Sequence, residues 1–256
     1  MSTKGGPLRP GSGSESESES EKQRSLWALF QAVVADDRRE AMRLLEARPE
    51  LASAVLEVGA TRADAVTHFF SEVKHYAYAG DTPLHLAAAA YRCELIEALV
   101  SRGASVRARN RRGAEPLHYA CDGIPGSAWW DPERQAQAVA LLTGSGADPN
   151  TLDKSGVAPL HRAARTRCTG AVKALLQHGA DVRVRNKSGS TPLHLAVMNT
   201  GRGGSGGDNA REEQVKIISL LLRAGARASD KDFAGRSVAA CATAEWMAAL
   251  LSPPEA

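Results

Sequence analysis

The sequence is poor in aromatic residues and in cysteine. Aromatic residues make up 5% of the 256 positions, and the 4 cysteines are dispersed, with no Cys-x-x-Cys pair among them. This spacing argues against a disulfide framework and against a zinc site, so we expect free thiols that are buried or half-buried. A low aromatic share with abundant alanine and leucine fits thin helices that pack at close range.

Long apolar runs are also missing from the chain. No run is long enough to span a membrane, and the N-terminal residues lack the apolar core of a signal peptide. We therefore expect a cytoplasmic protein. The formal net charge of +3 is mild, and it does not by itself indicate binding to nucleic acid.

A short motif recurs through the chain and organises the rest of it. Its fullest form is Thr-Pro-Leu-His-Leu-Ala, and its prolines follow one another at intervals of 33, 43 and 33 positions: Pro83, Pro116, Pro159 and Pro192. Threonine suits a helix N-cap, and proline suits the first helical position. The leucine and alanine that follow fall on one side of a short helix, so that side can pack tightly on a neighbour. A period near 33 residues predicts a repeat protein.

The histidine of the motif recurs at the same phase in four units, as His85, His118, His161 and His194. Neighbouring repeats must solve the same packing problem. We therefore expect each histidine to bond within its own unit and to the adjacent repeat, and not to bind a metal or act in catalysis.

The chain offers no clear pair of a nucleophile and a base. Cys168 lies near Arg165 and Arg167, which can lower the pKa of a thiol, but no histidine outside the structural set is in reach. We therefore predict a protein that is not an enzyme, with no catalytic residues, no metal and no cofactor.

Each motif helix is followed by a second apolar segment. The second helices are expected at about 93–101, 136–143, 170–177 and 211–223, and a Gly-Ala pair after each is a typical C-cap. Short polar runs then lead to the next motif and end in glycine. These runs predict β-hairpin fingers between successive repeats.

The pattern divides the chain into four parts. Residues 1–24 are rich in serine and glutamate and are expected to form a disordered tail, either merely solubilising or acting as an acidic lure for a basic surface. Residues 25–79 read as a capping helix pair plus an insertion, in which 65–73 has the spacing of a short extra helix. Residues 80–234 hold four repeats, and 235–256 form a C-terminal capping repeat and tail.

These units resemble ankyrin repeats across about 25–251. Longer phrases, such as residues 78–81 and 199–204, are similar to those of a group of bacterial ankyrin proteins with long insertions between helices. The resemblance implies an all-α ankyrin-repeat solenoid of stacked helix pairs with short β-hairpin fingers. It also implies a scaffold that binds proteins with its concave side, through fingertips and first helices.

The row of fingertips is the first candidate site. Finger 103–113 has four arginines and no acidic residue, finger 179–189 has three basic residues against Asp181, and finger 146–156 is near neutral. Successive fingers line up at roughly 10 Å, which predicts a basic patch for an acidic protein segment; the alternative is a solvated edge without function. The predicted binding residues are Arg107, Arg109, Arg111, Arg112, Arg183, Arg185 and Lys187. The fingers lack interleaved aromatics, so we expect a protein partner for a monomeric chain, and not nucleic acid.

The second candidate site combines two insertions between first and second helices. Residues 122–132 and 199–208 should emerge on one edge of the solenoid, two repeats apart. They would bring together a tryptophan pair, arginines and a glycine-rich loop, which suits a small anionic ligand, either phosphate or a nucleotide-like group. The residues are Trp129, Trp130, Arg165, Arg167, Arg202, Gly203 and Gly204. The loop lacks the Lys-Ser/Thr of a P-loop, and the alternative is that the insertions pack on each other around the tryptophans.

Overall fold

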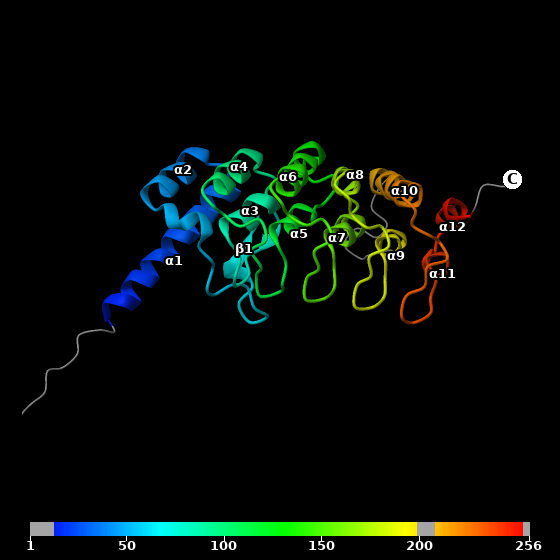
Figure 1. The fold of residues 1–256 in the computed structure, drawn as a ribbon, viewed down its shortest axis with the longest axis horizontal. Coiled ribbons are helices and arrows are strands. Elements are labelled where there is room, and N and C mark those ends of the chain that lie inside the picture. Colours follow the sequence, from blue (N-terminus) through cyan, green and yellow to red (C-terminus); the bar gives the residue numbers. More distant parts are fainter. Residues whose placement is uncertain (1–12, 199–207, 253–256) are drawn as a thin grey trace, which may run out of the picture.

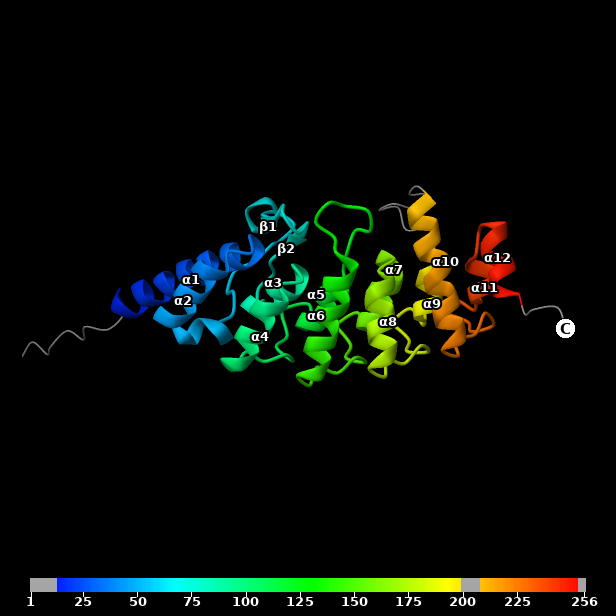
Figure 2. The same cartoon turned by 90° about the horizontal axis from the view of Figure 1, so that it is seen from above.

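The chain forms an elongated stack of helix pairs (Figures 1 and 2), described over residues 13–198 and 208–252 of a computed structural model. The first helices of the pairs that carry or follow the motif are α3 (Pro83–Ala89), α5 (Pro116–Ala120), α7 (Pro159–Thr166), α9 (Pro192–Val197) and α11 (Val238–Cys241). The second helices are α4 (Cys93–Ser101), α6 (Pro132–Gly144), α8 (Thr169–Gln177), α10 (Asp208–Arg223) and α12 (Glu245–Leu251). First helices pack on first helices and second helices on second helices, so the predicted solenoid is confirmed.

The four motif histidines hold neighbouring repeats together. In each unit the residue before the proline donates its backbone N–H to the histidine Nδ1 at 3.1 Å. The Nε2 atom then faces a backbone carbonyl of the next unit, as His118 does with Val157 O at 2.9 Å. Because Nδ1 accepts a hydrogen bond, Nε2 carries the proton and donates it. The predicted structural role of these histidines is confirmed.

A single hydrophobic cluster runs the length of the stack, from Leu26 in the first helix to Leu251 in the last. Alanine fills the close contacts between first helices: Ala87 and Ala120 are both fully buried. Small side chains let helix axes approach closely, and the leucines then fill the layer between first and second helices.

The N-terminal end differs from the sequence-based expectation. Helix α1 (Gly13–Val34) packs on α2 (Arg38–Ala47), and it begins well before the predicted start at Ser25; residues 1–12 lie outside the described residues. The difference has a physical cause in contacts with the following segment. Gln23 bonds the backbone of Val55 and of Glu57 at 3.1 and 3.2 Å, and Glu21 pairs with Arg48. These long-range contacts hold a polar segment in a helix that composition alone disfavours.

The insertion before the first motif folds as a β-hairpin, so the extra helix predicted over 65–73 is wrong. After the short 3-10 helices η1 (Pro49–Ser53) and η2 (Val66–His68), strand β1 (Phe69–Phe70) pairs antiparallel with β2 (His75–Tyr76). Trp27 of α1 stacks on Phe70 with ring centroids 5.1 Å apart. An apolar run this short fits both the helical period of 3.6 residues and the strand period of 2, and packing against α1 favours the strand.

Candidate partner-binding surfaces

The four fingers between repeats end in the same Asx turn, in which an Asn or Asp side chain accepts backbone amides. In the first, Asn110 Oδ1 accepts the amides of Arg112 and Ala114 at 2.9 and 3.1 Å, and Gly113 adopts a left-handed φ of 74°. The other fingers repeat this turn with Asp153, Asn186 and Asp232. An Asx side chain followed by glycine is a strong turn-former, so each fingertip is set by its own sequence.

Backbone hydrogen bonds join each fingertip to the one before it. The residue after the Asx position donates its amide to a carbonyl of the preceding finger or loop, at 2.8 to 3.1 Å. The donors are Arg111, Lys154, Lys187 and Phe233. These four residues therefore occupy equivalent positions in successive fingers, and the fingers form the lower edge of the solenoid in Figure 1.

All seven predicted fingertip residues are exposed, and most of their contacts leave the positive charge in place. Arg107 donates to Gly146 O at 3.0 Å, Arg185 to Gly189 O at 2.8 Å, and Arg111 to Ala60 O. A carbonyl orients a guanidinium without cancelling its charge. These arginines therefore both connect fingers and keep the surface basic.

Three of the predicted residues have partners of other kinds. Arg112 lies over the ring of Tyr78, 5.0 Å from its centroid, which leaves its charge in place. Arg109 pairs with the buried carboxylate of Glu115 at 2.9 Å, and Arg183 pairs with Asp230 at 3.2 Å. The positive charge of Arg109 and Arg183 is thus offset within the chain.

Lys154 is a basic fingertip residue that the sequence analysis did not select. Its finger counted as near neutral because it also contains Asp148 and Asp153. Asp148 is exposed, but the Asp153 carboxylate points inward: one oxygen closes the turn and the other meets Arg162 at 3.3 Å. Lys154 is exposed at the position equivalent to Arg111 and Lys187. The repeated pattern Asx-basic-x-Gly is the signal that marks it.

A largely buried ionic network ties the hairpin to two repeats, those that contain α5 and α7. Arg162 on α7 binds Asp122 at 2.8 Å and Asp153 at 3.3 Å, and His75 of β2 approaches the same Asp122 oxygen at 3.7 Å. Burial by itself raises the pKa of Asp122, but the Arg162 guanidinium and His75 hold it well below its usual value. The His75 ring also packs on Tyr119 of α5, with centroids 4.2 Å apart. The hairpin therefore covers part of the first-helix surface beside the first finger (Figures 1 and 2).

The two tryptophans of the α5–α6 connection are held by the neighbouring repeats. Trp129 stacks on Tyr91, with centroids 6.2 Å apart and an interplanar angle of 23°. Trp130 donates its Nε1–H to the buried Gln135 at 3.0 Å. Beside them, burial raises the pKa of Cys168 to about 11, which outweighs any lowering that Arg165 and Arg167 could cause.

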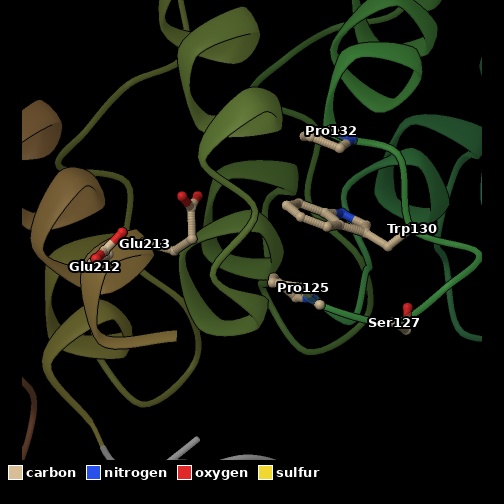
Figure 3. Close-up of a pocket in the computed structure, with 7 residues that line it drawn as sticks. Pro125, Ser127, Trp130, Pro132, Glu212 and Glu213 are labelled. Carbon is tan, nitrogen blue, oxygen red and sulfur yellow. The ribbon is translucent and has the colours of Figure 1, made fainter. Parts of the chain in front are cut away.

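The structure brings together only part of the predicted anion site. Arg165 is exposed, Arg167 is buried with a left-handed φ of 63°, and the remaining members, Arg202, Gly203 and Gly204, lie outside the described residues. A pocket of about 290 Å³ does lie beside Trp130 (Figure 3), and across from it stand Glu212 and Glu213 of α10. Among the described residues, its lining contains these two carboxylates and no arginine or lysine.

Comparison with known families decides what kind of repeat this is. A family model described as ankyrin repeats in three copies matches residues 132–232, and one described as a single ankyrin repeat matches 79–111. The chain belongs to the ankyrin-repeat family. Ankyrin repeats are generally protein-interaction modules, and the stack described above is an ankyrin solenoid.

Two curated relatives share part of this ankyrin solenoid. The chain is 32% identical over 121 residues to E3 ubiquitin-protein ligase KEG of Arabidopsis thaliana, covering 47% of this chain and 6% of that protein. It is 38% identical over 97 residues to Ankyrin repeat and SOCS box protein 16 of Mus musculus, covering 37% of this chain and 20% of that protein. The chain thus spans a small part of either relative.

Metal sites and membrane-spanning helices can be judged over the described residues alone. Within 13–198 and 208–252, no group of three or more histidine, cysteine, aspartate or glutamate side chains is placed to hold a metal ion. Over the same ranges no helix has the length and apolar character needed to cross a bilayer.

Proposed function

We propose that this ankyrin solenoid binds an acidic segment of a partner protein along its fingertips. The observation that carries the proposal is the line of exposed basic residues at one repeated position: Arg111, Lys154 and Lys187. Arg107, Arg112 and Arg185 flank this line and are bonded to neutral groups, so they add to its charge. A row of like charges steers an oppositely charged segment and sets its register.

The backbone ladder between fingertips supports the same proposal. Each tip is joined to the preceding finger or loop by an amide-to-carbonyl bond of 2.8 to 3.1 Å, so the spacing of the basic side chains is built in before a partner arrives. Preorganisation of this kind lowers the ordering cost of binding. The line ends at Phe233, which is 73% exposed and offers an apolar contact next to the charges.

Charge reversal at the three tip positions tests the proposal. The triple variant Arg111→Glu, Lys154→Glu, Lys187→Glu is expected to weaken binding to a glutamate-rich peptide by at least about tenfold, since three favourable charge contacts become repulsive. Isothermal titration calorimetry at two salt concentrations measures this, and wild-type affinity should fall as salt rises. The tip side chains contribute no ion pair within the described chain, so the fold should persist.

A matched variant separates local recognition from net charge. Arg39, Lys173 and Arg223 are exposed on the second helices of other units, and their replacement by glutamate changes net charge equally. This control should bind the peptide close to wild type. Equal loss in both triple variants, or unchanged binding in the tip variant, would overturn the proposal.

A further inference from the structure

The pocket beside Trp130 lies away from the fingertips, where two segments far apart in the sequence meet. It is formed between the α5–α6 connection and the first turns of α10, which stand on the same long edge of the solenoid in Figure 2. Its volume of about 290 Å³ is at the lower end of the range for small-molecule sites, roughly 300 Å³ and above. The space therefore suits one inserted side chain better than a cofactor.

One side of the pocket is apolar and fixed in place. The indole of Trp130 lies between Pro125 and Pro132 (Figure 3), and its Nε1–H is bonded to Gln135 at 3.0 Å. Gln135 is itself fully buried and donates to Ala120 O at 3.0 Å. The indole is thus oriented by a second layer of hydrogen bonds.

The other side carries uncompensated negative charge. Glu213 pairs with Lys216 at 2.8 Å, whereas Glu212 forms no ion pair with the residues that the structure describes. The neighbouring Arg211 does not offset it, because its guanidinium lies over Trp246, 5.0 Å from the ring centroid. Lys216 acts on both carboxylates, and two carboxylates against this one lysine give the described lining of the pocket a net negative charge.

We propose that this pocket binds a positively charged side chain, lysine or arginine, of a partner protein. A cation is attracted both by the face of an indole and by a nearby carboxylate, and its aliphatic stem packs on proline rings. A neutral side chain would use the apolar side alone, and an anion would be repelled by Glu212 and Glu213. The proposal is independent of the fingertip site, which has the opposite charge and lies on another edge.

Titration of the full chain with Nα-acetyl-lysine amide, whose side-chain ammonium group stays charged, tests the proposal. Nα-acetyl-norleucine amide is the uncharged probe of similar length. The Trp130 indole N–H resonance is followed in ¹H–¹⁵N NMR spectra. The lysine probe is expected to shift this resonance in a saturable way at millimolar concentration, and the norleucine probe is not. Glu212→Gln is expected to weaken lysine binding about fivefold, in keeping with loss of a partly exposed charge partner.

Glu97→Gln is the matched control. Glu97 is exposed on α4, so this substitution removes the same charge far from the pocket. It should leave the titration unchanged. Equal shifts with both probes would show an apolar pocket and overturn the proposal. So would the absence of any shift with the lysine probe, or an unchanged affinity in Glu212→Gln.

Discussion

Mild acid is expected to destabilise the solenoid strongly, because four histidines are buried in their neutral form. Burial lowers the pKa of His85, His118, His161 and His194, that of His118 from 6.5 to about 4. The unfolded chain takes up these protons near pH 6.5, while the folded chain resists until lower pH. Stability is therefore fully present above pH 6.5 and is lost as pH falls toward 4, with His118 alone contributing on the order of 3 kcal/mol.

The geometry explains why protonation is unfavourable. Histidine Nδ1 already accepts a backbone N–H at 3.1 Å in each unit, so a proton there would place two donors face to face. Urea unfolding at a series of pH values between 7.5 and 4 measures the effect, and the midpoint should fall steadily below pH 6.5. A constant midpoint down to pH 5 would contradict it. Asp122 does not contribute to the change between pH 6.5 and 4, because the stability that comes from its lowered pKa is lost only below about pH 4.

Removal of the buried guanidinium of Arg162 is expected to be the most damaging single substitution in the ionic network. Arg162 is 8% exposed and is the cation between Asp122 and Asp153. Arg162→Met keeps an apolar stem of similar length but leaves two carboxylates buried together, which costs about 3–5 kcal/mol. Chemical denaturation followed by circular dichroism measures the loss.

Two further variants give this prediction its controls. Arg165→Met changes the same residue type on the same helix at an exposed position, from which Arg165 lowers the pKa of Asp122 less than Arg162 does, and should cost less than about 0.5 kcal/mol. Adding Asp122→Asn to Arg162→Met should recover part of the lost stability, because it removes one uncompensated charge. If Arg162→Met is no more harmful than Arg165→Met, the network does not stabilise the fold.

The repeat helices were predictable because their signals are local. The second helices expected at about 93–101 and 170–177 are observed at Cys93–Ser101 and Thr169–Gln177. Each of the four motif units contains its own proline at the helix start and its own turn glycine, so its boundaries do not depend on distant contacts. The β-hairpin at 69–76 and the early start of α1 were missed, since both are stabilised by contacts with remote residues such as Trp27 and Val55.

The candidate sites also combine features set by the local sequence with features set by contacts between remote residues. The exposed basic fingertips follow from a repeated four-residue pattern, but the contribution of Lys154 depends on where Asp153 points. The sequence analysis proposes a site on the edge with the insertions, and a pocket beside Trp130 lies on that edge. Glu212 and Glu213 reach it from α10, some eighty positions along the chain from Trp130, and no local pattern indicates that approach.

The period, the helix starts and the finger turns of the repeat can be read from the sequence alone, because each of these rests on interactions within about one repeat. Tertiary structure alone decided which charges stay available. It directs Asp153 and Asp122 to Arg162, offsets Arg109 with Glu115, and leaves Glu212 without an ion-pair partner among the described residues. The physical reason is that charge compensation depends on distance and burial, and in a solenoid both are set where one repeat meets the next.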